Sequence, residues 1–101
     1  MMTPDYELID NPLRHCYEFH IDGYTPKVQY IRSRYGDIYL THTEVPFPLR
    51  RQGIGSQLVN KVLRSVSQQD ARVVPVCPFV AAYIHKHPQW NHLVLRETQL
   101  T

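Results

Sequence analysis

Residues 45–56 read Val-Pro-Phe-Pro-Leu-Arg-Arg-Gln-Gly-Ile-Gly-Ser and join a strand-like stretch to a helical one. Gly53 and Gly55 lack Cβ atoms, so the backbone there can approach a ligand closely and expose successive N–H groups. The first turn of a helix also leaves four N–H donors unpaired beside a partial positive charge, which suits a phosphate oxygen. The segment therefore predicts an anion-binding loop at a helix N-terminus.

Two other phosphate-binding motifs do not fit this loop. No Gly-Lys-Ser or Gly-Lys-Thr follows, as a Walker loop requires, and the third glycine of a dinucleotide fingerprint is missing. A structural alternative stays open, in which the two glycines only make a tight strand-to-helix connection while Arg50 and Arg51 are solvated.

After the loop, the apolar residues have helical spacing. They recur at intervals of three and four from Ile54 to Val66, which predicts a helix over about 53–69 with one buried face. Residues 73–77 then predict a buried strand, although Pro75 has no N–H and is expected only at an edge, a bulge or a split in a sheet. A second helix is expected to begin at Pro78 and to end at residues 87–88.

Before the loop, apolar and polar residues alternate instead. Residues 17–21 and 28–32 predict two strands, and residues 22–23, Asp-Gly, supply the positive φ angles of a two-residue hairpin turn. A further turn is expected at residues 35–37. The first dozen residues look like an irregular arm.

The third predicted strand runs from residue 38 to Pro46. Its alternation puts one set of side chains, Ile38, Leu40 and His42, on the face opposite to Tyr39, Thr41 and Thr43. The predicted order is therefore three antiparallel strands, a helix, a strand and a helix.

Length and composition favour one globular domain over residues 1–101. The chain has 43% hydrophobic and 20% charged residues, enough apolar surface for a core. Its formal net charge of +2 identifies no partner. No apolar run approaches the ~20 residues of a membrane span, and the first residues lack a secretion signal, which predicts a cytoplasmic protein without a membrane partner. Cys16 and Cys77 have no metal or redox spacing and are expected to be free thiols.

The loop resembles motif A of the GNAT superfamily of acetyl-CoA-dependent N-acetyltransferases. The resemblance rests on Arg50-x-x-Gly53-x-Gly55 after a strand that ends at Val45, and the wider sequence looks like the minimal GNAT-like proteins. It covers about residues 15–92, because residues 42–46, 74–80 and 83–88 resemble them too. It implies an α/β (α+β) fold of the GNAT-like acyl-CoA N-acyltransferase type. Such a fold has a mixed, mostly antiparallel central sheet with splayed strands and flanking helices.

The resemblance also implies how acetyl-CoA would be held. The loop amides would bind the pyrophosphate of coenzyme A, and main-chain groups near residues 43–45 would hold the pantetheine arm between two splayed strands, which would account for Pro75. Arg51 departs from many relatives, which have a small residue there, and adds charge near the phosphates. Lys86 either faces the nucleotide 3′-phosphate or is solvated. The implied cofactor-binding residues are Thr43, Glu44, Val45, Arg50, Arg51, Gln52, Gly53, Ile54, Gly55, Ser56, Cys77, Pro78 and Lys86.

Four residues are candidates for catalysis. Cys77 precedes a predicted helix N-terminus, whose partial positive charge favours a thiolate. Such a thiolate could accept the acetyl group from coenzyme A. In the alternative, Cys77 is an inert buried thiol and the acetyl group passes directly to the amine. Tyr83 matches the general acid of many GNAT enzymes, or it packs beside its helical neighbours. Glu44 and His42 are candidate general bases, or they form a solvated polar face. The histidines at 85, 87 and 92 predict no metal site, because they do not share a helix face.

These observations together predict an N-acetyltransferase. The acceptor is expected to be an amine, in a peptide, a lysine side chain or a polyamine, that enters an open groove, because the chain lacks the long N-terminal helical segment of larger relatives. The alternative from another class is a non-catalytic coenzyme A-binding, acyl-CoA-binding or regulatory module. A nucleic-acid-binding domain ranks third, since the arginines are scattered and the aromatic residues form no stacking motif.

Overall fold

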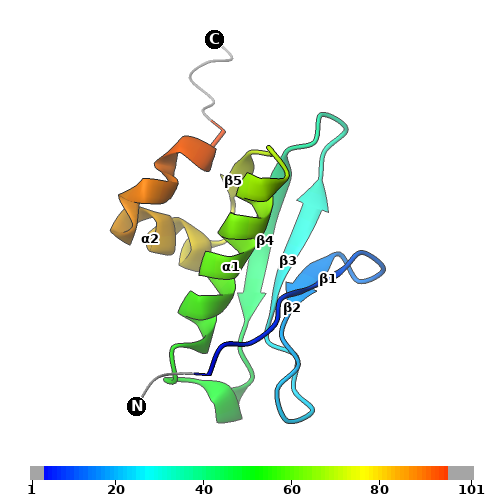
Figure 1. Ribbon diagram of the computed structural model, residues 1–101, viewed down its shortest axis with the longest axis vertical. Coiled ribbons are helices and arrows are strands. Elements are labelled where there is room, and N and C mark those ends of the chain that lie inside the picture. Colours follow the sequence, from blue (N-terminus) through cyan, green and yellow to red (C-terminus); the bar gives the residue numbers. More distant parts are fainter. Residues whose placement is uncertain (1–3, 96–101) are drawn as a thin grey trace.

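A computed structural model describes residues 4–95 of the chain, and these form one sheet with helices (Figure 1). The five strands are hydrogen-bonded in chain order, and all neighbours are antiparallel except β4 and β5, which are parallel. The strands are β1 (Ile9–Asn11), β2 (Cys16–Glu18), β3 (Lys27–Arg32), β4 (Ile38–Glu44) and β5 (Val73–Pro75). The helices are α1 (Ile54–Gln68) and α2 (Pro78–Lys86), with short 3-10 segments η1 (Phe47–Leu49) and η2 (Pro88–Leu93).

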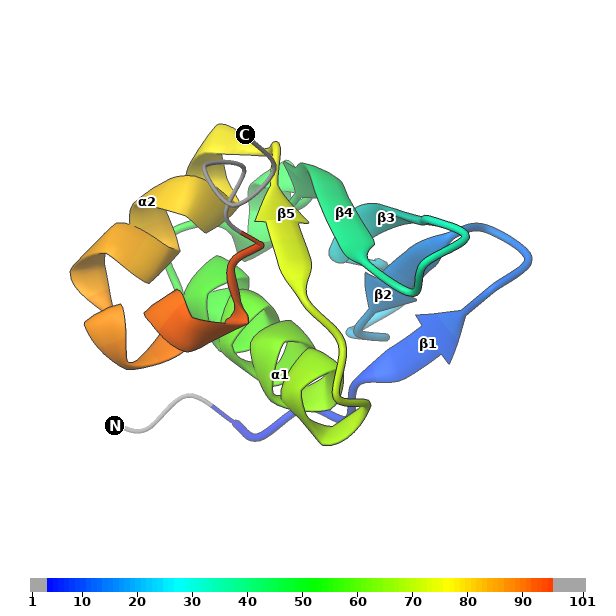
Figure 2. The same ribbon diagram turned by 90° about the horizontal axis from the view of Figure 1, so that it is seen from above.

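The helices leave one face of the sheet bare. Helix α1 lies across one face, and α2 with η2 lies beside β5 at the end of the sheet (Figure 2). Within residues 4–95, no helix covers the opposite face. None of the helices in this part of the chain has the length and apolar character needed to cross a bilayer. The mixed, mostly antiparallel sheet with flanking helices confirms the predicted fold class.

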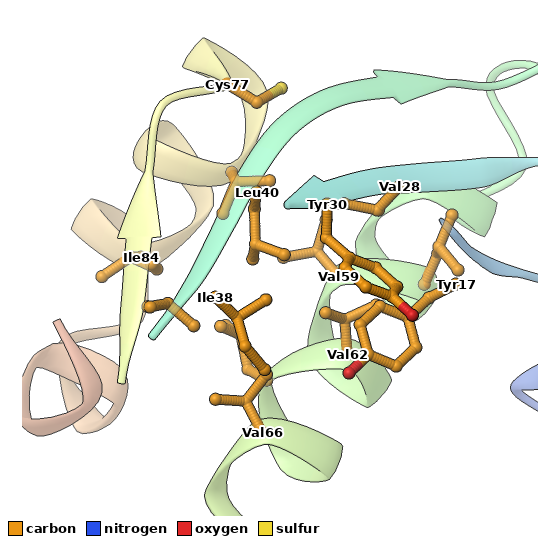
Figure 3. Close-up of a cluster of buried hydrophobic side chains, with 14 of the residues drawn as sticks. Tyr17, Val28, Tyr30, Ile38, Leu40, Val59, Val62, Val66, Cys77 and Ile84 are labelled. Atoms are coloured by element: carbon orange, nitrogen blue, oxygen red, sulfur yellow. The ribbon is translucent and has the colours of Figure 1, made fainter. Parts of the chain in front are cut away.

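Side chains of α1 and of the covered sheet face form the core (Figure 3). The apolar stripe predicted for α1 is buried, and Leu58, Val59 and Val62 have no exposed surface. Residues from β2, β3 and β4 pack against it, among them Tyr17, Val28 and Leu40. At about 25 cal/mol per Å² of apolar surface, each such side chain contributes about 1.5–3 kcal/mol, so the helix is fixed firmly to the sheet.

The prediction of an irregular arm over the first dozen residues is wrong in part, because Ile9–Asn11 form strand β1. Ile9 pairs with Glu18 and Asn11 with Cys16. A three-residue edge strand is too short to show an alternating pattern, so pairing with β2 decides its conformation. The predicted hairpin is confirmed: Asp22 and Gly23 have φ angles of 50° and 83°, and Ile21 bridges to Tyr24.

A bulge in β4 overturns one part of the predicted alternation. Tyr30 pairs with Leu40 but Gln29 pairs with His42, so Thr41 is an extra residue in β4. A one-residue bulge reverses which side chains face the core beyond it. His42 therefore lies with exposed Gln29 on the bare face, and not with Ile38 and Leu40 as the simple alternation predicted. Thr43 instead pairs with buried Val28 on the helix side.

Strands β4 and β5 pair only briefly and then part. Their register runs from Ile38 with Val73 to Leu40 with Pro75, whereas β4 continues to Glu44. At the parting point Cys77 N donates to Leu40 O (2.9 Å). We call the gap between residues 41–45, at the end of β4 and directly after it, and the start of α2 the split. It matches the splayed strands that the family resemblance implied.

Pro75 is accommodated by the edge position of β5. On the β4 side Arg72 O accepts from Ile38 N (2.8 Å), and on the other side Val73 O accepts from Leu95 N (2.9 Å). Successive residues of a strand direct their main-chain groups to alternate sides, so the nitrogen of Pro75 faces away from β4. Its missing N–H removes no hydrogen bond between β4 and β5, as expected of an edge proline.

Candidate active site

The N-terminus of α1 is uncapped. Gly53 is the N-cap with φ 77° and ψ 8°, and within residues 4–95 no side chain accepts a hydrogen bond from the first turn. Arg51, two residues earlier, also has a positive φ of 64°, which a non-glycine residue adopts at a cost of roughly 1 kcal/mol. The chain thus enters α1 through a tight bend whose N–H groups have no acceptor in the helix.

A cavity of about 490 Å³ opens at this helix terminus. Its lining comes from the end of β4, the loop after η1 and the first turns of α1 and α2. The lining residues are His42, Thr43, Glu44, Val45, Leu49, Arg50, Arg51, Gly53, Ile54, Gly55, Ser56 and Phe79. Ten of the predicted site residues are thereby brought together, namely all of these except Leu49 and Phe79.

Phe79 lines the cavity but was not among the site residues predicted from the sequence. A Cβ built on Gly55 would lie 3.0 Å from Phe79 Cζ and 3.5 Å from Val45 Cγ2. Gly55 is therefore needed for close packing and not for an unusual φ angle. Phe79 remains 44% exposed and lines the cavity, so its ring forms a wall beside the helix terminus. Its position two residues after Cys77 was the signal available in the sequence.

The two arginines make the entrance of the cavity positive. Arg50 Nε donates to Val45 O (3.0 Å), and its guanidinium lies 5.8 Å from the ring centre of Phe47. Both contacts hold Arg50 against the segment that follows β4. Arg51 is exposed and lines the cavity. Together with the partial charge of the helix terminus, these side chains favour an anionic ligand.

Cys77 lies at the narrow end of the split. Cys77 is only 4% exposed, and Figure 3 shows its side chain beyond Leu40, where β5 joins α2. Its Sγ is 3.3 Å from Thr43 Oγ1 across the split. Burial alone raises the pKa of Cys77, but hydrogen bonding from Thr43 and from the N–H groups of Val80, Phe79 and Thr43 lowers it below its ordinary value. Cys77 and Pro78 do not line the cavity themselves, although Thr43 connects the thiol to it.

His42 and Glu44 line the cavity from the bare face of the sheet. Glu44 pairs with Lys27 and His42 with Gln29, and both side chains are exposed. An exposed imidazole and carboxylate at the cavity can exchange protons with solvent, as a general base must.

Besides Cys77 and Pro78, three further predicted site residues lie outside the lining. The hydroxyl of Tyr83 accepts a hydrogen bond from Asn60 Nδ2 (3.1 Å) on α1, and its ring stacks on His87 with centroids 4.0 Å apart. Lys86 is exposed in the last turn of α2, and Gln52 Nε2 donates to Pro48 O (3.2 Å). The structure does not bring these side chains to the cavity, and their assigned roles stay predictions.

The residues present fit coenzyme A better than a metal ion. Unpaired N–H groups and two cations suit a pyrophosphate, and the split leaves an edge of β4 unpaired for an amide-containing chain. Among residues 4–95, no group of three His, Cys, Asp or Glu side chains is arranged to hold a metal.

A comparison with protein families agrees with this geometry. The family model described as GCN5-related N-acetyl-transferase matches residues 16–93. This range includes both helices and strands β2 to β5. No curated protein matches the chain. Since the family match spans more than half of its length, the chain belongs to the GCN5-related N-acetyltransferase family.

Proposed function

We propose that this protein binds acetyl-CoA in the cavity at the N-terminus of α1 and transfers its acetyl group to an amine. The observation that carries the proposal is the uncapped first turn of α1, which opens into a cavity lined by Arg50 and Arg51. Membership of the family supports acetyl transfer in general. When bound, acetyl-CoA supplies an activated thioester.

Each part of the cavity has a role in this proposal. The N–H groups of residues 53–56 hold the pyrophosphate, and Arg51 adds a charge that complements it. Main-chain groups of residues 43–45, which lack a β5 partner, hold the pantetheine amides. Much of the rate then comes from holding two reactants together, which is worth ~7–11 kcal/mol.

The acceptor amine must lose its proton before it attacks. Glu44 and His42 line the cavity from the bare face, and in this proposal one of them takes that proton directly or through water. The bare face has no helix over it within residues 4–95. An open approach of this kind suits an amine on a peptide, a lysine side chain or a polyamine.

The coenzyme site is tested by adding a carboxylate to the loop. Gly53→Glu places a negative charge where the pyrophosphate would lie, so acetyl-CoA binding measured by titration calorimetry should be lost. Gly36→Glu is the matched control, because Gly36 has a similar φ of 89° and lies in the β3–β4 turn. Equal affinity in the two variants would contradict the proposed site.

Turnover is tested separately from binding. The protein is mixed with acetyl-CoA and a panel of peptides, lysine derivatives and polyamines, and release of free coenzyme A thiol is followed. Release that depends on an amine supports the transferase. Binding without release on any acceptor would favour a non-catalytic acyl-CoA-binding or regulatory module.

Two chemical routes remain to be separated by intact mass. In direct transfer the amine attacks the thioester and the protein mass never changes. In the covalent route Cys77 Sγ takes the acetyl group, coenzyme A leaves as its thiol, and the amine then takes the acetyl group from sulfur and gives up a proton. An acetyl adduct that Cys77→Ala abolishes, together with lost turnover, supports the covalent route. Full turnover by Cys77→Ala supports direct transfer.

A further inference from the structure

A side-chain hydrogen bond of Cys77 crosses the split. Thr43 Oγ1 on β4 lies 3.3 Å from Cys77 Sγ, which precedes α2. The main chain of Cys77 is anchored as well, since its N–H donates to Leu40 O (2.9 Å) and its carbonyl accepts from Ala81 N (3.0 Å). The thiol is therefore held in place by the backbone, and the hydroxyl is brought to it by β4.

The bulge at Thr41 is what brings the Thr43 side chain to this position. Without the extra residue, continued alternation from Ile38 and Leu40 would put His42 on the helix side and Thr43 on the bare face. The bulge reverses this order, so that Thr43 lies beside Val28 and meets the thiol. Bulges commonly redirect side chains next to active sites.

The two cysteines of the chain have opposite environments. Burial, together with the hydrogen bond to Glu18 and the charge of Glu18, raises the pKa of Cys16 to about 11. Cys77 is also buried, and burial is the largest influence on it, yet the donors around it lower its pKa. Thr43 contributes both its hydroxyl and its N–H to that lowering. The neighbouring titratable groups on β4, His42 and Glu44, lie on the opposite face of the strand.

We propose that Thr43 is a positioning residue whose hydroxyl donates a hydrogen bond to the Cys77 sulfur and holds it as a thiolate at the narrow end of the split. A hydroxyl can donate to a thiolate but gains less from a neutral thiol, so the contact favours the charged form. This inference deepens the proposed function and rests on it for the use of the thiolate in acetyl transfer.

The test reads the thiolate directly and needs no coenzyme. All variants carry Cys16→Ser, so that Cys77 is the one thiol, and thiolate absorbance in the ultraviolet is measured against pH. Thr43→Val keeps the side-chain shape without the hydroxyl and should raise the titration midpoint by about one pH unit, which is about a tenfold lower acid dissociation constant of the thiol. Thr43→Ser should restore the original midpoint.

Thr41→Val is the matched control. Thr41 lies on the same strand, and its hydroxyl donates to Gln29 O (3.3 Å) instead of to sulfur. It should leave the midpoint unchanged. Cys77→Ser gives the absorbance blank, and circular dichroism confirms that each variant is folded. If Thr43→Val does not fold, Thr43→Ala replaces it in the same comparison.

The outcomes separate this inference from the proposed function. An unchanged midpoint in Thr43→Val, or a shift that Thr43→Ser does not reverse, overturns the inference while acetyl transfer can persist. A raised midpoint that serine reverses supports it even if no amine is acetylated. Where turnover is measurable, Thr43→Val should also shift the acidic limb of the plot of kcat against pH to higher pH by the same amount. The KM for acetyl-CoA should change little.

Discussion

Gly53 and Gly55 belong to one motif, but they are needed for different physical reasons. Gly53 has a positive φ angle, which a Cβ disfavours, and it sets the bend into α1. Gly55 has ordinary helical geometry, and its hydrogen leaves room for the ring of Phe79. The same residue type therefore solves a backbone problem at one position and a packing problem two residues later.

Replacing Gly55 by alanine tests this difference. The new methyl group would meet Phe79 at 3.0 Å, so the ring, which lines the cavity, must move by a few tenths of an ångström. We expect Gly55→Ala to weaken acetyl-CoA binding at least about tenfold, or about 1.4 kcal/mol, in titration calorimetry. Helical stability should not fall, because alanine is the better helix former by about 1 kcal/mol.

A second substitution serves as its control. Phe79→Leu shortens the side chain opposite Gly55, so the double variant should regain much of the lost affinity. If Gly55→Ala binds acetyl-CoA as tightly as the parent protein, the ring of Phe79 does not border the proposed coenzyme site.

At the scale of elements, α1 connects the core to the cavity. Its first turn opens into the cavity, while Leu58 and Val62 on the same helix are fully buried. The N-terminal segment also holds it: Gln57 Oε1 accepts from Tyr6 N (2.8 Å), and Lys61 pairs with Asp5 (2.6 Å). The orientation of the first turn of α1 is thus fixed by packing along the whole helix.

Truncating Leu58 tests that packing. Leu58→Ala removes a fully buried side chain and leaves a cavity, so the free energy of unfolding in urea should fall by about 2–5 kcal/mol. Gln68→Ala, on the exposed side of the same helix, should change it by less than about 0.5 kcal/mol. Similar losses in both variants would contradict the assigned core face.

At the scale of the whole molecule, a buried carboxylate links stability to pH. The side chain of Glu18 is 6% exposed and accepts hydrogen bonds from His20 Nε2 (2.5 Å), Asn11 Nδ2 (3.1 Å) and Cys16 Sγ (3.3 Å). Burial alone raises the pKa of Glu18, but these donors together lower it below its ordinary value of 4.5. The contribution of Glu18 to stability is therefore full above that value and is lost as the pH falls through the lowered pKa.

The lowered pKa of Glu18 gives the stability of the protein a measurable pH dependence. The free energy of unfolding should fall as the pH drops below about 4.5. Glu18→Gln should be less stable at neutral pH by about 1–3 kcal/mol, and the acid dependence should become shallower. Exposed Glu7 offers the control, since Glu7→Gln should keep the stability and the pH profile of the parent. A Glu18→Gln profile identical to that of the parent would refute the coupling.

Local physical rules explain what the sequence alone could predict. Periods of two and three to four residues distinguished strands from α1, and Asp22-Gly23 fixed its hairpin because few residues adopt positive φ angles. The glycine-containing loop predicted an anion site because helix ends always leave N–H groups unpaired. Most of the cavity lining was therefore foreseeable, as its residues are close together in the chain.

The tertiary structure decided whatever depends on distant pairing. Strand β1 exists because β2 supplies its hydrogen bonds, and the bulge at Thr41 depends on register with β3, which reversed the faces of His42 and Thr43. The contacts of Phe79 with Gly55 and of Thr43 with Cys77 join segments more than 20 residues apart. No local period encodes such contacts, because they arise only when the whole sheet and both helices pack together.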